Sequence, residues 1–224
     1  MYLTHKKSAN FDIMIPGIEP SADGLTTVYT HHLPTTPAAQ VQVRYEVRSD
    51  GAIDTTLMYD PVEGLGDMPE FGMMFVLDAG LDHVRWYGRG PEETYADRQG
   101  GGKMGIWEND VVDNLASYLV PQECGNHTDV RWGEVYGDDG YGIRFTALGA
   151  PMYFSALPYT PHELENAAHP HELPPIYHTV VRVSLGQMGV GGDDSWGSRV
   201  HPEYLLDVSG HMEFRFRWQA FKRQ

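Results

Sequence analysis

Residues 41–59 read VQVRYEVRSDGAIDTTLMY, and this stretch decides the fold class. Valine and tyrosine alternate with polar and charged side chains as far as Arg48, a Ser-Asp-Gly sequence follows, and the alternation resumes at Ile53. A period of two places the apolar side chains on one face of a β-strand. Ser-Asp-Gly is typical of a tight turn. We therefore predict a β-hairpin with one buried face.

The same alternation recurs along the rest of the chain. Apolar residues at 212, 214, 216 and 218 alternate with charged or polar ones, after a run from Tyr204 to Val208 that ends at a Ser-Gly turn signal. Other short runs that predict strands are residues 73–77, 83–87, 141–147, 152–156 and 179–185. Many short strands separated by turn residues, among 25 glycines and 15 prolines, predict an all-β antiparallel sandwich.

Helical signals are few, and we expect at most one or two short helices. Thr160 and Glu163 fit a capping box, and the proline between them suits the first helical position. A short helix is expected to follow as far as about Ala168, and residues 113–119 are expected to form another turn or two. Residues 1–25 lack a clear pattern and are predicted to be a lead-in to one domain that spans residues 26–224.

Composition and charge narrow the classes of function. The chain has 16 Lys and Arg residues against 31 Asp and Glu residues, a formal net charge of −15. Nucleic acid and anionic membranes would repel such a chain, whereas a neutral ligand such as a sugar suits it. Cys124 is the only cysteine and cannot form an internal disulfide. The first residues show no apolar signal sequence, so we expect a cytoplasmic protein.

Several segments resemble catalytic motifs only superficially. Residues 88–91, Gly-Arg-Gly-Pro, follow a predicted strand, but the proline and the all-β surroundings favour a tight turn over a phosphate-binding loop. Cys124 is more typical of a small buried side chain than of a nucleophile. A glycosidase needs two carboxylates about 5–10 Å apart, and nothing in the sequence pairs two of them. We assign no catalytic residue to this chain.

Histidines gather in one part of the sequence, at His162, His169, His171 and His178. A zinc site needs three or four converging ligands, and none of the standard spacings is present here. We predict ordinary surface-loop histidines, with no metal or other cofactor bound by the chain.

Trp196 lies in a loop rather than in a strand. Residues 189–197 read GVGGDDSWG, and so many glycines make a poor core strand but a good shaped loop. Sugar rings have apolar faces that pack on a flat indole. Burial is the commoner fate of tryptophan, so the composition leaves both a sugar platform and a core position open.

Five segments together resemble the C-terminal domain of large β-galactosidases, which also occurs as the small chain of two-chain β-galactosidases. They are VRWYGRGPEETYADR (84–98), YLVPQECGN (118–126), VRW (130–132), MGVGGDDSWG (188–197) and HPEY (201–204). Their order and spacing agree with the family over roughly residues 30–224. The GGDDSW element is the most specific of the five.

The resemblance implies an antiparallel supersandwich of the galactose mutarotase type. In the family, the catalytic glutamates lie on a separate (β/α)₈ barrel, which also holds most of the magnesium and sodium ions. The resemblance therefore implies a non-catalytic chain that completes the galactoside pocket of a large β-galactosidase partner, in an oligomeric enzyme that hydrolyses terminal β-galactosides. The isolated chain is expected to be inactive, and Trp196 is expected to stack on the sugar or its aglycone.

Other matched residues find supporting roles. Residues expected to support the pocket rim are Asp193, Asp194, Ser195, Glu123 and Asn126. Arginines expected to pin loops through acidic neighbours are Arg89, Arg98 and Arg131. The family domain usually carries several dozen more residues before the first matched segment, so an exposed strand edge is also expected.

Two other functions stay open. A stand-alone carbohydrate-binding module would use the same tryptophan platform without a partner. An aldose epimerase would need a general base and a general acid across the sugar ring, for which His83, His127 and His178 are candidates.

Overall fold

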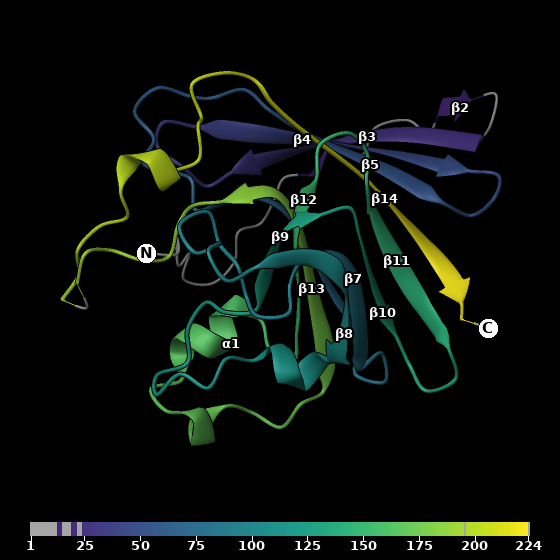
Figure 1. The fold of residues 1–224 in the computed structure, drawn as a ribbon. Helices are drawn as coiled ribbons and strands as arrows, with labels where there is room; N and C mark the ends of the chain where they lie inside the picture. The colour runs from purple at the N-terminus through teal and green to yellow at the C-terminus, as the bar shows by residue number, and fades with distance from the viewer. Residues whose placement is uncertain (1–12, 15–18, 22–23, 195, 224) are drawn as a thin grey trace.

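Two antiparallel β-sheets face each other across one hydrophobic core in the computed structural model, which describes residues 13–14, 19–21, 24–194 and 196–223 (Figure 1). The larger sheet has the strand order β1-β3-β4-β5-β14-β11-β10-β7-β8, with β2 paired to β3. The smaller has the order β6-β13-β12-β9. The predicted all-β antiparallel sandwich is confirmed.

The strands of the larger sheet are β1 (Ile13–Met14), β2 (Glu19–Ser21), β3 (Gly24–Leu33), β4 (Ala39–Arg48), β5 (Ile53–Tyr59), β7 (His83–Gly90), β8 (Lys103–Asp110), β10 (Trp132–Tyr136), β11 (Tyr141–Ala147) and β14 (Met212–Lys222). Those of the smaller sheet are β6 (Glu70–Asp78), β9 (Asn126–Val130), β12 (Met152–Leu157) and β13 (His178–Gln187).

The hairpin predicted from residues 41–59 is strands β4 and β5. They pair antiparallel, with Val43 opposite Leu57, and both of these side chains are buried. In the turn, Gly51 N–H donates to the Arg48 carbonyl at 3.1 Å and the Asp50 side chain accepts from the backbone of Ala52 at 3.0 Å. The side-chain bond gives the turn a local reason to close where the alternation breaks.

Aromatic side chains from both sheets fill the space between them. Phe75 of β6 lies 5.1 Å from Phe145 of β11 and 6.1 Å from Phe216 of β14, measured between ring centroids. Trp86 of β7 is fully buried in the same core. Such ring pairs add to the stabilisation from apolar burial and fix how the two sheets sit on each other.

A second, smaller core lies under α1 (Pro161–Asn166), the single α-helix of the described residues. The predicted capping box is confirmed, since Thr160 Oγ1 accepts from Glu163 N–H and the Glu163 carboxylate accepts from Thr160 N–H. The helix ends two residues before the predicted Ala168. Its Leu164 packs with Cys124, and burial raises the pKa of that thiol to about 11, as expected for a small buried side chain.

The other helical segments are short 3-10 turns: η1 (Val111–Asn114), η2 (Pro170–Glu172) and η3 (Pro202–Tyr204). The turn expected over residues 113–119 therefore begins and ends earlier. Among the helices of the described ranges, none has the length and apolar character that crossing a membrane requires.

Two local predictions were wrong. Residues 204–208, predicted as a strand, form none: Tyr204 ends η3, and Leu206 and Val208 reach the core from the loop that follows. Residues 88–90, predicted as a turn, continue strand β7. A Cβ atom at Gly88 would lie 2.6 Å from Val130 Cγ2, so that glycine permits close packing of two strands instead of a turn.

The sandwich has open edges. In the described part of the chain, β6 pairs only with β13, and its outward side chains Met74 and Val76 are 49% and 56% exposed. Strands β1 and β2 fall within the segment predicted as a lead-in and pair with β3; most other residues of that segment lie outside the described ranges.

Candidate functional site

The connection between β13 and β14 carries Trp196 and projects beyond both sheets, as the yellow-green loop at the left of Figure 1 shows. Trp196 is 92% exposed. Of the two fates that the sequence left open, a core position is excluded. The indole therefore has no packing role within the described chain.

Aspartates shape the loop around this tryptophan. Asp194 Oδ1 accepts hydrogen bonds from the backbone N–H groups of Trp196 at 2.8 Å and Ser198 at 3.4 Å, and the first of these bonds lowers the pKa of Asp194. Asp193 Oδ1 lies 2.8 Å from Nε2 of His201, whose pKa it raises. These contacts favour one backbone path and so help to fix where the exposed ring sits.

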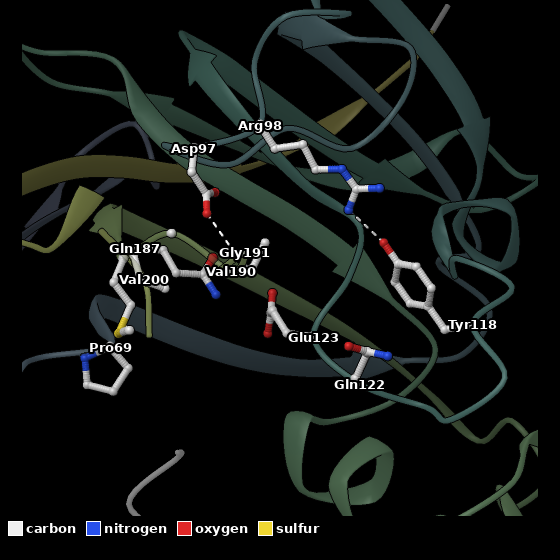
Figure 2. A pocket seen from close by; sticks show the side chains of 12 residues that line it. Pro69, Asp97, Arg98, Tyr118, Gln122, Glu123, Gln187, Val190, Gly191 and Val200 are labelled. Atoms are coloured by element: carbon white, nitrogen blue, oxygen red, sulfur yellow. Dashed lines mark hydrogen bonds between the residues drawn. The ribbon is translucent and has the colours of Figure 1, made fainter. Parts of the chain in front are cut away.

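A cavity of about 630 Å³ lies at the base of the same loop (Figure 2). Three segments that are distant in sequence supply most of its lining: the loop after β7, the connection between η1 and β9, and the end of β13 with the loop that follows. Pro69, just before β6, completes it. The lining residues are Pro69, Asp97, Arg98, Tyr118, Gln122, Glu123, Gln187, Met188, Gly189, Val190, Gly191 and Val200. A space of this size suits a small polar ligand.

Two acceptor atoms in the cavity wall are buried without a hydrogen-bond partner among the described residues, namely Asp97 Oδ1 and Gln187 Oε1. The other oxygen of Asp97 accepts from Gly191 N–H at 2.7 Å (Figure 2). A Cβ atom at Gly189 would lie 2.5 Å from that oxygen, so glycine is required for the approach. Unpaired buried acceptors cost about 1–3 kcal/mol each, which water or a ligand with hydroxyl donors would relieve.

Glu123 forms part of the cavity wall but is held from behind. Its Oε1 accepts from the Tyr95 hydroxyl at 3.2 Å and from the guanidinium of Arg182. Arg182, only 5% exposed, also donates to Glu70 at 3.2 Å and to Ser155 at 3.2 Å. Burial raises the pKa values of Glu70 and Tyr95. The network gives the cavity a rigid, charged floor.

Arg98 and Tyr118 form another side of the cavity, and Glu93 holds both of them from outside its lining. Arg98 Nη1 donates to Glu93 Oε1 and to the Tyr118 hydroxyl, both at 2.7 Å, and that hydroxyl also donates to Glu93. Burial and the bond to Glu93 raise the pKa of Tyr118. Glu93 Oε2 accepts from Gly125 N–H at 2.7 Å, so this cluster ties two of the three segments together.

Two of the three predicted arginine pairs are present as ion pairs, and Arg131 contacts a backbone carbonyl instead. Arg98 pairs with Glu93, and Arg89 Nε donates to Asp129 Oδ2 at 2.5 Å. Arg131 donates to the backbone carbonyl of Asp129. All three arginines therefore hold loops or strand ends.

The structure places the predicted rim residues in different surroundings. Glu123 lines the cavity, and Asp193 and Asp194 support the projecting loop beside it. Asn126 is buried and is not among the residues that line the cavity. Its side chain donates to the Thr94 carbonyl at 2.9 Å. Ser195 lies outside the described residues.

Sequence reasoning missed the two unpaired acceptors, Asp97 and Gln187. Asp97 stands within a matched segment, so the resemblance could have singled it out. Gln187 ends a β-strand and carries no local signal of a site. Only the fold brings the two together.

The three histidines considered for epimerase chemistry do not share a site. His127 is buried and stacks on Trp86 with ring centroids 3.9 Å apart, and burial lowers its pKa to about 3. His83 borders a different cavity, and His178 bonds to Glu163 beside the helix at 3.0 Å.

Comparison with known proteins gives consistent matches. A family model described as "Beta galactosidase small chain" matches residues 4–218. A β-galactosidase of Halalkalibacterium halodurans is 40% identical over 202 residues, which cover 89% of this chain and 20% of that protein. A β-galactosidase small subunit of Latilactobacillus sakei is 36% identical over 206 residues, 88% of this chain and 64% of that one. The chain thus spans about a fifth of the length of the large relatives.

Among solved structures, a GalM/aldose epimerase homologue from C. elegans aligns with a TM-score of 0.45 and 9% identity, over 93% of this chain and 69% of that one. A galactose mutarotase related enzyme from Lactobacillus acidophilus aligns with a TM-score of 0.44 and 9% identity, over 96% and 72%.

Proposed function

The chain belongs to the β-galactosidase small chain family, and from this premise we propose that it completes the galactoside-binding pocket of a large β-galactosidase partner. In this proposal a (β/α)₈ barrel of the partner carries the catalytic glutamates and the magnesium and sodium ions. Trp196 is the platform on which the sugar or its aglycone stacks.

The observation that carries the proposal is the 92% exposure of Trp196 on a loop that its own aspartates shape. Covering an apolar ring that is exposed to water is favourable, because it removes apolar surface from water. A flat indole also loses little conformational entropy on binding. A tryptophan presented in this way fits one wall of a pocket whose other walls come from another polypeptide.

The cavity beside the loop supports a hydroxyl-rich ligand or a polar partner segment. Asp97 and Gln187 offer unpaired acceptors, and the chain has no excess of positive charge that would favour an anion. Sugar hydroxyls are donors of the kind these atoms lack.

The carboxylates of the cavity favour binding over bond cleavage. Glu123 is engaged by Arg182 and Tyr95, and one oxygen of Asp97 is engaged by the Gly191 backbone. Retaining glycosidases need one carboxylate free to attack and one that exchanges a proton. We therefore assign the chemistry to the partner.

A reconstitution experiment tests this proposal. The purified chain should not hydrolyse nitrophenyl β-galactoside alone and should restore turnover to a large β-galactosidase chain that lacks this domain. Trp196→Ala should lower kcat/KM of the complex by about 5- to 150-fold, corresponding to a stacking contribution of about 1–3 kcal/mol. Ile106→Ala, which removes another exposed apolar side chain, is the matched control. Turnover by the chain alone would contradict the division of roles.

A stand-alone carbohydrate-binding module is the second candidate, favoured by a cavity that this chain forms from its own residues. Calorimetric titration of the lone chain with galactose and lactose separates the two. Millimolar or tighter binding without a partner supports the module, whereas no heat supports a pocket that is completed elsewhere.

A further inference from the structure

The connection between α1 and β13 brings three potential metal ligands together at a place that the proposed function does not use. They are His169, His171 and Glu172, all exposed. Each offers one ligand atom, and these atoms all lie within 4.8 Å of one another. Ligands at positions i, i+2 and i+3 match no standard zinc motif, so spacing alone did not predict this cluster.

A short 3-10 turn creates the arrangement. Pro170 opens the turn with a fixed φ angle, and Glu172 N–H donates to the His169 carbonyl at 3.0 Å. Side chains three apart eclipse on a 3-10 helix, which sets Glu172 beside His169. The rings of His169 and His171 are stacked, with centroids 5.4 Å apart and planes 26° apart.

The carboxylate is oriented before any ion arrives. Glu172 Oε2 accepts from the backbone N–H of Ala168 at 2.8 Å, which leaves Oε1 facing Nδ1 of His169 at 3.1 Å. A ligand that is itself hydrogen-bonded loses less entropy on binding and tunes the site. The bond from the Ala168 backbone orients the Glu172 carboxylate, as neighbouring side chains would do in a buried site.

We propose that His169, His171 and Glu172 bind one divalent transition-metal ion of the zinc class. Two imidazoles with one carboxylate suit Zn²⁺, Ni²⁺ and Cu²⁺, whereas Mg²⁺ and Ca²⁺ prefer oxygen ligands alone. Three protein ligands leave the remaining positions to water, because the site is open to solvent. The net charge of −15 favours the approach of a cation.

Binding would fix the path of the chain from the end of α1 to the start of β13. An ion that binds only the folded state raises its stability by mass action. For a domain of this size, a hundredfold excess over Kd is expected to raise Tm by roughly 5–10 °C.

Calorimetric titration of the untagged full chain with ZnCl₂ tests the proposal. We expect one Zn²⁺ per chain with a micromolar Kd, no heat with MgCl₂ beyond that of dilution, and at least about tenfold weaker Zn²⁺ binding in each of His169→Ala and His171→Ala. His211→Ala is the matched control, since it removes an exposed imidazole that pairs with Asp60 at 2.7 Å.

The outcomes are decisive because the ligands are exposed and their removal should leave folding intact, which circular dichroism checks. X-ray absorption of the zinc-loaded chain should show two imidazole ligands, and lose that signature in both variants. Absence of Zn²⁺ binding, or binding that the two variants leave unchanged, would overturn the assignment.

Discussion

Arg182 lies under the cavity, and its replacement by methionine tests whether the buried charge network holds the site together. Arg182 is 5% exposed, and its guanidinium contacts Glu70, Glu123 and the Ser155 hydroxyl. Methionine keeps a similar length and removes the charge. Both carboxylates then lie in a poorly solvated place without their cation.

The expected loss of stability is about 3–5 kcal/mol, the usual cost of removing one partner from a buried ion pair. With a urea m-value of about 2 kcal/mol/M, the unfolding midpoint should fall by about 2 M. Arg215→Met, an exposed arginine on β14, is the matched control and should change stability by less than about 0.5 kcal/mol.

The pH dependence sharpens this prediction. Burial raises the pKa of Glu70, and Arg182 opposes that rise. Without Arg182 the folded-state pKa rises further above the unfolded one, so the folded state binds more protons and its stability falls as pH increases through that window. The gap between variant and wild type should therefore narrow as pH falls from 7 towards 5. A loss below about 1 kcal/mol, or a gap independent of pH, would refute the reasoning.

Two further predictions concern the larger sheet. The pKa of His83 is raised, chiefly through its hydrogen bond to Asp138. The stabilisation from protonated His83 is fully present below the unfolded-state pKa and is lost as pH rises through the folded-state pKa. Between pH 6 and 8, thermal unfolding should therefore show a larger loss of stability in wild type than in His83→Asn. Gly88→Ala should destabilise the chain by about 1–3 kcal/mol in urea, because its Cβ atom would meet Val130 at 2.6 Å; an unchanged midpoint would show that the strands can separate freely.

Much of the sandwich could be predicted from sequence, because many strands bury one face and expose the other. The hairpin of β4 and β5 is an example, with buried Val43 and exposed Arg44 side by side. Strand β9 was missed for a physical reason. Its burial pattern has no alternation, and its buried side chains include His127 and Thr128, which are polar. A period-two search fails where both faces of a strand are covered.

The site was predictable only in part, and for a related reason. Glycine content marked the Trp196 loop, because that signal is local in sequence. Asp97 and Gln187 come from segments about 90 residues apart, and both line the same cavity. Strand pairing elsewhere in the fold brings them there, and neither residue determines that pairing. His169 and His171 were recognised as close in sequence, yet their shared direction depends on a 3-10 turn that spacing rules for α-helices and loops do not describe.

Trp196 and Glu123 would play different parts in a two-chain arrangement. Trp196 is exposed, so it contributes free energy only when something covers it. Glu123 is already engaged by Arg182, so it can shape the wall but is poorly placed to transfer a proton. In the proposed function, the chain acquires its binding role only when the partner covers the exposed indole of Trp196. Substitutions at Trp196 should therefore lower substrate use and leave the stability of the fold unchanged. Substitutions at Arg182 should lower the stability of the fold first and affect sugar binding only as a consequence.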